Sequence, residues 1–224
     1  MIQRVFPALL VCAALLAPAT AGATIAVKLD IDALSTAADT IVLGRVESKA
    51  SRWEGQRIVT DYAVKVAMPV LGGPDAGSML TVQTLGGRVD DLAQRVHGTP
   101  GFVVGEDVLL FLQTVKAPGP LRVVGMAQGR FKIERDAQGA VWATQDLTGL
   151  GLAEVVDVDA RGKKATKLLE HPAPLRLPLG ALLGQVGVSL GKVDAKLRPE
   201  VTARLGQKLD VAYDFAVELG EVRK

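Results

Sequence analysis

The chain has 224 residues, of which 49% are hydrophobic and 22% charged, a composition ordinary for a globular protein that buries a core. Aromatic residues make up only 4%, so the core must be built from Val, Leu, Ala and Ile. With 26 basic and 24 acidic residues, the chain lacks the excess of Lys and Arg that binding to nucleic-acid phosphates requires, so no nucleic-acid partner is expected.

The first 23 residues are predicted to be a secretory signal peptide. Arg4 gives a short positive start, residues 5–16 form an apolar run, and residues 17–23 are small. Ala21-Gly22-Ala23 is the expected cleavage site, and the apolar run is too short to span a bilayer comfortably. A buried N-terminal helix is the alternative interpretation. We expect a secreted or periplasmic protein with no transmembrane segment in the mature chain.

Cys12 is the only cysteine in the chain, and it lies inside this leader. A lipid anchor at Cys12 is an alternative, but Val11 is bulkier than the small residue expected before a lipoprotein cysteine. Cleavage after Ala23 leaves a mature chain without cysteine. We therefore expect a disulfide-free protein that is stable through its core alone in an oxidising compartment.

Residues 24–147 are predicted to form one mainly β domain. Residues 30–38 indicate a short helix with Asp30 as its N-cap. Alternating or β-rich runs predict strands at residues 40–46, 58–70, 79–85, 108–115, 121–126, 130–135 and 141–144. The run at 108–115 is apolar enough to be covered on both faces. Short strands separated by turns at this spacing are typical of a small antiparallel barrel, here expected to be OB-like.

Glycines mark the turns of this domain. Gly86 and Gly87 are expected at a bend that needs positive φ, and Gly129 in the turn of a hairpin made by residues 121–126 and 130–135. Gly105 and Glu106 directly precede the most apolar strand. Glu106 is expected to cap nearby backbone N–H groups, the alternative being a lone functional acid.

After Leu147 the sequence predicts a proline-punctuated linker and an irregular C-terminal extension, residues 148–224. Pro172, Pro174 and Pro178 interrupt any central strand, and residues 179–188 indicate a short helix. The basic residues between 161 and 167 are expected in a solvated loop. Residues 209–219 fit either a strand or a helix, and their Val, Tyr and Phe favour the strand.

Parts of the sequence resemble a group of predicted secreted bacterial proteins. The resemblance covers roughly residues 30–135, and it is carried by the successive segments 38–46, 60–70, 85–87, 98–106, 109–112 and 124–131. It implies export and a compact β domain, but no reaction. The layout is also distantly similar to the netrin-like barrels, which are OB-folds and include the tissue inhibitors of metalloproteinases. Those inhibitors chelate zinc through an N-terminal cysteine, which the mature chain lacks.

The motifs that would indicate catalysis or a metal site are weak. Gly187 to Gly191 matches the nucleophile-elbow pattern around Ser189, but His97 and His171 both precede the serine, opposite to the order in α/β-hydrolases. Asp90 and Asp91 near His97 lack the spacing of a calcium loop, and a solvated loop is favoured there. No cofactor or metal is expected.

Trp53, beside Arg52, is the best sequence candidate for contact with a partner, because aromatic residues and arginine are enriched at interfaces. The leading hypothesis is an exported, non-enzymatic binding or accessory domain for a protein or glycan in the cell envelope or outside the cell. The alternatives are an inhibitor or partner of a secreted protease, and a serine hydrolase that uses Ser189.

Overall fold

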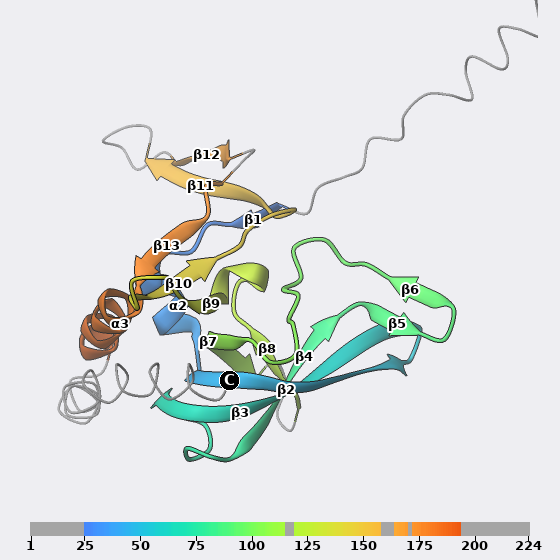
Figure 1. The fold of residues 1–224 in the computed structure, drawn as a ribbon. Helices are drawn as coiled ribbons and strands as arrows, with labels where there is room; N and C mark the ends of the chain where they lie inside the picture. Colours follow the sequence, from blue (N-terminus) through green and yellow to red (C-terminus); the bar gives the residue numbers. More distant parts are fainter. Residues whose placement is uncertain (1–24, 115–118, 158–163, 170–171, 194–224) are drawn as a thin grey trace, which may run out of the picture.

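The fold was analysed in a computed structural model that describes residues 25–114, 119–157, 164–169 and 172–193. The predicted leader with Cys12, His171 and the ambiguous segment 209–219 lie outside the described residues. The described chain is mainly β, as predicted, and contains two α-helices (Figure 1). Its elements are β1 Ile25–Val27, α2 Ile31–Ala37, β2 Thr40–Glu54, β3 Arg57–Leu71, β4 Met79–Leu85, β5 Gly87–Val89, β6 Leu92–Gln94, β7 Asp107–Thr114, β8 Leu121–Val123, the 3₁₀-helix η1 Met126–Gly129, β9 Arg130–Arg135, β10 Val141–Gln145, β11 Gly151–Asp157, β12 Lys164–Leu169, β13 Leu175–Pro178 and α3 Leu179–Val193.

The main sheet has eight strands in the order β13-β10-β9-β7-β2-β3-β4-β8, and β8 also pairs with β7. Strands β7, β2, β3, β4 and β8 therefore follow one another around a ring. The ring is uneven: β2 and β3 pair along nearly their whole length, whereas the parallel pairing of β4 with β8 is a single residue pair, Val82 with Leu121. The structure thus shows a multi-strand β fold without an evenly closed barrel.

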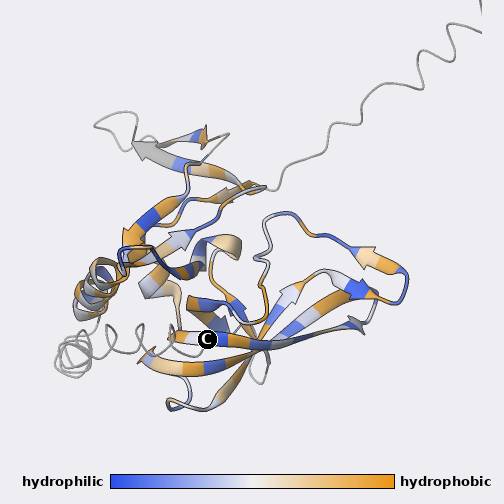
Figure 2. Ribbon diagram, viewed as in Figure 1, coloured by the Kyte–Doolittle hydropathy of each residue, from blue (hydrophilic) through white to orange (hydrophobic). Residues whose placement is uncertain are grey.

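Strand β7 is the centre of this arrangement. Its residues Val108 to Leu112 are all fully buried, which confirms the prediction of a strand covered on both faces. Leu109 and Phe111 point to a core shared with α2 and α3, while Val108, Leu110 and Leu112 point into the ring with Val64 and other aliphatic side chains. Figure 2 shows hydrophobic and hydrophilic residues alternating along the strands β2 and β3 in front of it.

The predicted hairpin between residues 121–126 and 130–135 is wrong. Strands β8 and β9 both pair with the same strand, β7, at Leu112 with Val123 and at Leu110 with Arg130, so they run end to end along it. Gly125 and Met126, the residue at which η1 begins, have φ of +63° and +64°. Because of these two residues in the left-handed conformation, β9 continues along β7 beyond β8 and does not turn back to pair with β8.

Two other elements match their predictions closely. Helix α2 begins after Asp30, whose carboxylate accepts a hydrogen bond of 2.8 Å from the backbone N–H of Ala33. The strand predicted at 79–85 is β4 with the same bounds. Strand β2 is longer than predicted, and at Gly44 its backbone comes so close to β3 that an added β-carbon would lie 2.5 Å from the carbonyl oxygen of Lys65.

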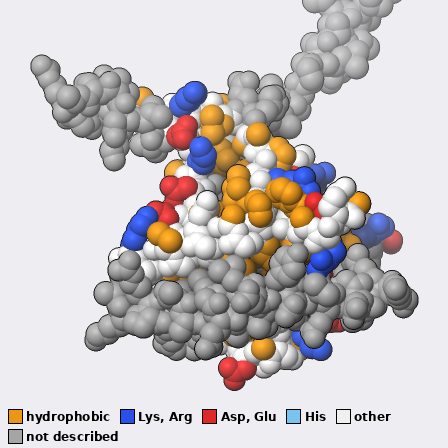
Figure 3. All heavy atoms as spheres, turned by 60° about the vertical axis from the view of Figure 1, so that its left-hand side comes forward, with side chains coloured by type: hydrophobic (Ala, Val, Ile, Leu, Met, Phe, Trp, Pro, Cys, Tyr) orange, Lys and Arg blue, Asp and Glu red, His pale blue; other side chains and the backbone are white. Residues whose placement is uncertain are grey.

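The helix predicted at residues 179–188 is confirmed as α3, which extends further to Val193, whereas the prediction of an irregular extension is wrong for residues 175–178. Strand β13 pairs with β10, and α3 buries Leu182, Leu183, Val186 and Leu190 against the core at helical spacing. Strand β13 lies at the edge of the sheet, where one row of backbone N–H groups has no partner strand. Proline, which lacks an N–H group, is therefore tolerated in and beside this strand. Figure 3 turns the side that carries α3 forward and shows apolar side chains gathered in its upper part.

A second sheet of three strands, β1-β11-β12, was not predicted. Strand β1 runs parallel to β11, and β11 pairs with β12 in antiparallel fashion. Lys164 and Lys167 therefore belong to a strand, and the expected solvated loop is wrong for these two residues.

Candidate functional site

Two hollows lie on either side of Thr99 and Pro100, which line both of them. The smaller has a volume of about 320 Å³ and opens where β4 and β8 diverge beyond their single pair. The larger, about 680 Å³, lies over β9 and β10. We call them the seam cleft and the sheet cleft.

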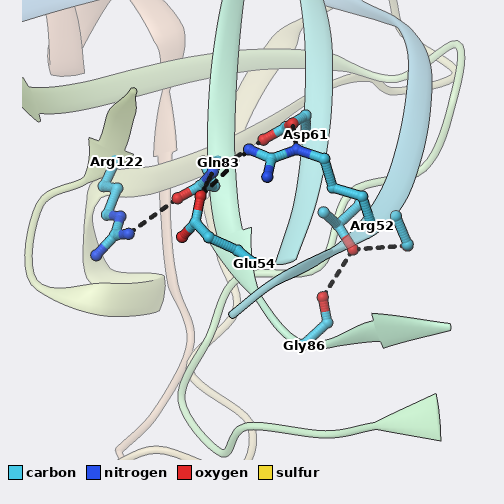
Figure 4. Close-up of polar contacts among 8 residues, drawn as sticks. Arg52, Glu54, Asp61, Gln83, Gly86 and Arg122 are labelled. Atoms are coloured by element: carbon cyan, nitrogen blue, oxygen red, sulfur yellow. Dashed lines mark hydrogen bonds and ion pairs between the residues drawn. The ribbon is translucent and has the colours of Figure 1, made fainter. Parts of the chain in front are cut away.

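A polar network bridges the seam cleft (Figure 4). The guanidinium of Arg122 on β8 donates to the side-chain carbonyl of Gln83 on β4 at 2.9 Å. The amide of Gln83 donates in turn to Asp61 on β3 at 3.2 Å and to Glu54 on β2 at 3.4 Å. Gln83 is only 1% exposed. Side-chain hydrogen bonds therefore connect β4 with β8, whose backbones pair at a single residue pair.

Arg52 belongs to this network, but Trp53 does not. The Nε of Arg52 donates to Asp61 at 2.9 Å and its Nη2 to Glu54 at 3.3 Å (Figure 4). The hydrogen bond with Asp61 is the main cause that raises the pKa of Arg52. Successive side chains of a strand point to opposite faces, so Trp53, which is 48% exposed, lies on the other face from Arg52. The pair predicted as one contact surface is thus divided between two faces.

The floor of the sheet cleft is the outward face of β9 and β10, and its walls are two loops at 99–103 and 172–174. Side chains alternate along β9, so Phe131 and Ile133 enter the core while Arg130, Lys132 and Glu134 point the other way. The lining residues are Thr99, Pro100, Gly101, Phe102, Val103, Glu106, Ala127, Arg130, Lys132, Glu134, Thr144, Asp146, Leu147, Thr148, Pro172 and Pro174.

A nearly buried ion pair stands at the inner end of the sheet cleft. The Nη2 of Arg130 donates to both carboxylate oxygens of Glu106, at 2.7 and 2.8 Å, and the two side chains are 11% and 5% exposed. Glu106 also accepts a hydrogen bond of 3.0 Å from the backbone N–H of Val103. The guanidinium carbon of Arg130 lies 5.3 Å from the centre of the Phe102 ring. Glu106 therefore caps a backbone N–H group and, in addition, fixes an arginine in the cleft.

Among the described residues, three side-chain atoms are buried without a hydrogen-bond partner: Nε of Arg122, Nε of Arg130 and Oγ1 of Thr144. All three belong to residues that line the two clefts, and Arg130 and Thr144 share the sheet cleft. Buried polar groups in folded proteins nearly always have a partner, which is protein, ordered water or ligand. Two of the three residues line the sheet cleft, which is also the larger of the two hollows, and we take it as the better candidate binding site.

Asp146, at the rim of the same cleft, is held in its ionised form. The hydroxyl of Thr148 is the main cause that lowers the pKa of Asp146, and the backbone N–H of Thr148 donates to it at 2.9 Å. Its carboxylate is therefore an acceptor at neutral pH.

The glycines expected at turns occupy positions where a residue with a β-carbon would be strained or crowded. Gly86, Gly87 and Gly105 have φ of +90°, +142° and +88°, the region that favours glycine. The carbonyl of Gly86 accepts a hydrogen bond of 2.7 Å from the hydroxyl of Thr60, as Figure 4 shows. Gly129 ends η1, where a β-carbon would lie 2.6 Å from a backbone oxygen. These residues shape the backbone around the ring and line neither cleft, as far as the described residues show.

Ser189 lies inside α3 and is 2% exposed, so the strand–turn–helix of a nucleophile elbow is absent around it. Its hydroxyl donates to the carboxylate of Asp32 and lies 2.9 Å from the carbonyl oxygen of Gln185. Lys192 donates to the same carboxylate at 2.8 Å, and this contact is the main cause that lowers the pKa of Asp32. These contacts tie α2 to α3.

Asp90 and Asp91 form the two-residue tip of the β5–β6 hairpin, and His97 is exposed beyond it. In the described ranges no group of three or more His, Cys, Asp and Glu side chains is arranged to hold a metal ion. No described helix has both the length and the apolarity needed to cross a membrane.

Comparison of the chain with protein-family models, with curated proteins and with solved structures gives no match.

The sheet cleft was missed by sequence reasoning. The signal that would have found its floor is the alternation in 130–134, which places Arg130, Lys132 and Glu134 on one face. Glu106, which pairs with Arg130, lies 24 residues before it in the chain, and no local sequence pattern connects the two residues.

Proposed function

We propose that this protein is an exported binding or accessory domain, without catalytic activity, whose protein or glycan partner occupies the sheet cleft. The observation that carries the proposal is the cleft of about 680 Å³ over β9 and β10, whose floor carries the half-exposed side chains of Lys132 and Glu134. A volume of this size falls within the range of about 300–1,000 Å³ that is usual for sites of small ligands.

The ring of β2, β3, β4, β8 and β7 is proposed to be an OB-like barrel. OB-folds are five-stranded, partly open barrels in Greek-key order, and both the number of strands and the open seam between β4 and β8 support the assignment. The alternative of an inhibitor or partner of a secreted protease rests on the same layout. Inhibition of extracellular metallo- or serine proteases by the purified protein would identify the partner as a protease.

Export is tested by expressing the full chain in a bacterial host and measuring the mass of the product in each cell fraction. We expect a soluble envelope or medium fraction whose first residue is Thr24, and a Cys12→Ala variant that is processed in the same way. A full-length cytoplasmic product would contradict export. A lipid mass on Cys12 would show an anchored protein instead.

Partner binding is tested with a variant that fills the sheet cleft. Gly101 lines the cleft and has open space around its missing side chain, so Gly101→Phe should block the cleft without disturbing the fold. Gly184→Phe is the matched control, because Gly184 on α3 also has nothing within 4 Å and lines a separate hollow of about 600 Å³ beside α2. Residues 24–224 of each protein are immobilised and exposed to envelope extracts, and bound proteins and sugars are quantified by mass spectrometry.

A partner should be retained by the wild type and by Gly184→Phe, and lost by Gly101→Phe. The proposal fails if all three proteins retain the same material. It also fails if the wild type shows turnover in a broad hydrolase screen.

A further inference from the structure

One carboxylate in the sheet cleft has no cation beside it. Arg130 is paired with Glu106 and Lys132 with Glu134, at 2.7 and 2.5 Å. Asp146 is a further carboxylate of the lining, and within the described ranges no Lys or Arg side chain forms a salt bridge with it. With two cations and three carboxylates, the described lining of the cleft carries a net charge of −1.

The carboxylate of Asp146 can be reached from solvent, because Asp146 is an exposed residue directly after the end of β10. Its hydrogen-bonding partners, the hydroxyl and the backbone N–H of Thr148, come from the same loop and lower the pKa of Asp146. The carboxylate is therefore charged at neutral pH. A carboxylate can accept about four hydrogen bonds, so it can still accept from a donor that enters the cleft.

Apolar surface lies beside this charge. The last residue pair between β10 and β13 is Gln145 with Leu175. Asp146 directly follows the first of these residues and Pro174 directly precedes the second, so the carboxylate and the exposed proline are neighbours at the strand ends. On the opposite wall the side chain of Val103 is 67% exposed and is available to a ligand.

A lysine or arginine side chain has both properties that this part of the cleft requires. Its aliphatic stem lies along apolar surface while its charged head donates hydrogen bonds to a carboxylate. An anionic ligand would be repelled by Asp146, and a neutral ligand would leave the charge of Asp146 without a partner. A free inorganic cation would compensate the charge but make no use of the apolar walls.

We infer that the sheet cleft receives a lysine or arginine side chain from a surface loop of a protein partner, with its charged head on Asp146 and its stem against Val103 and Pro174. The inference rests on the proposed function of this cleft and selects a protein over a glycan as the partner. An added strand is not the mode of binding, because β9 lies between β7 and β10, and β10 between β9 and β13. Peptides that bind by adding a strand need an exposed edge, which the floor lacks.

Asp146→Asn tests the charge. Asparagine has nearly the same size, and its carbonyl can still accept from the backbone N–H of Thr148, so the variant should fold as the wild type does. Asp75→Asn is the matched control, because Asp75 is an exposed aspartate between β3 and β4 that lines neither cleft. Val103→Ser shortens the apolar wall at a mostly exposed residue. Melting curves report the stability of each variant.

The probe is a displayed library of random dodecapeptides, each closed into a loop by a disulfide, and it is panned against residues 24–224. The peptide that binds most tightly is then synthesised as selected and as an uncharged analogue. The analogue carries norleucine in place of lysine, or citrulline in place of arginine, and so keeps the length of the side chain without its charge. Affinities are measured by calorimetry, and envelope extracts are passed over each immobilised variant.

The selected peptides should be enriched in lysine or arginine, and the uncharged analogue should bind about tenfold more weakly, the effect of one charged hydrogen bond. Asp146→Asn should weaken binding of the selected peptide by about the same factor, and Asp75→Asn by less than about twofold. Val103→Ser should weaken it by about threefold through lost apolar contact. Asp146→Asn should bind the selected peptide and its analogue equally, because the contact that distinguishes them is then absent.

Selected peptides without basic residues would overturn the inference, and so would equal affinity of Asp146→Asn and the wild type. The analogue experiment on the wild type gives the same decision should Asp146→Asn fail to fold. An envelope partner that Gly101→Phe loses, but that Asp146→Asn retains as the wild type does, would overturn the inference and leave the proposed function in place. A glycan partner would do the same. If the wild type binds neither peptide nor envelope partner, both proposals fail.

Discussion

The ion pair of Glu106 with Arg130 makes the sharpest prediction about stability. Glu106→Ala removes the carboxylate that accepts both hydrogen bonds from Nη2 of Arg130, whose side chain is only 11% exposed. The guanidinium would then be left nearly buried, with its Nε already unpartnered. Removing one member of a buried pair costs about 3–5 kcal/mol. A domain of this size is stable by about 5–15 kcal/mol, so the variant should lose a large share of its stability.

The double variant Glu106→Leu with Arg130→Met should be far less destabilised than the sum of the single variants, because both charges are then replaced by apolar groups. We expect it within about 2 kcal/mol of the wild type. Glu106→Gln should fall between wild type and Glu106→Ala, because its carbonyl can still accept from the N–H of Val103. Glu134→Ala is the control, since the pair of Glu134 with Lys132 is about half exposed and should be worth less than about 1 kcal/mol.

The assay is urea unfolding of residues 24–224 at 25 °C, followed by far-ultraviolet circular dichroism, with all four corners of the double-variant cycle. A loss of less than about 1 kcal/mol in Glu106→Ala would refute the reasoning. Additive effects of the two single variants would refute it as well, because they would show that the two side chains do not depend on each other.

The remaining predictions concern stability and its dependence on pH. Gly44→Ala should cost about 1–3 kcal/mol, because its new β-carbon meets backbone, whereas Gly101→Ala meets nothing within 4 Å and should be nearly neutral in the same unfolding assay. Gly184→Ala, in the open on α3, should stabilise the protein by about 0.5–1 kcal/mol, and a lower melting temperature would contradict this. The indole of Trp142 is the main cause that lowers the pKa of Asp136 below 3.8, so the stability this contact provides is present above about pH 5 and lost as the pH falls through the lower folded pKa. Trp142→Phe should therefore differ more from the wild type at pH 7 than at pH 2.5, and an equal difference at both values would contradict the linkage.

The parts of the fold that local patterns determine were predictable from the sequence. The unbroken apolar run of β7 implies burial on both faces, and Asp30 with the residues after it specifies the start of α2. The failures arise where partners are chosen over long distances. Nothing near Gly129 says that β9 continues along β7 past β8, and the positive φ of Met126, a residue that rarely adopts it, is imposed by the tertiary fold.

The candidate site was less predictable than the fold. Arg52 and Trp53 are adjacent in sequence, but strand geometry sends them to opposite faces, and Arg52 is held by Asp61. The sheet cleft joins residues from loops and strands as far apart as Thr99 and Pro174. Its floor and its walls are brought together only once the surrounding strands are placed.

The central claim is that the sheet cleft is where this protein meets its ligand. Chemical-shift mapping tests it directly, with ¹⁵N-labelled residues 24–224 titrated with the partner that the wild type retains from envelope extracts. The largest amide shifts should fall in 99–103, 130–134 and 144–148, the segments that line the cleft. Shifts concentrated at Gln83 and Arg122, or on α3, would place the ligand elsewhere and contradict the account.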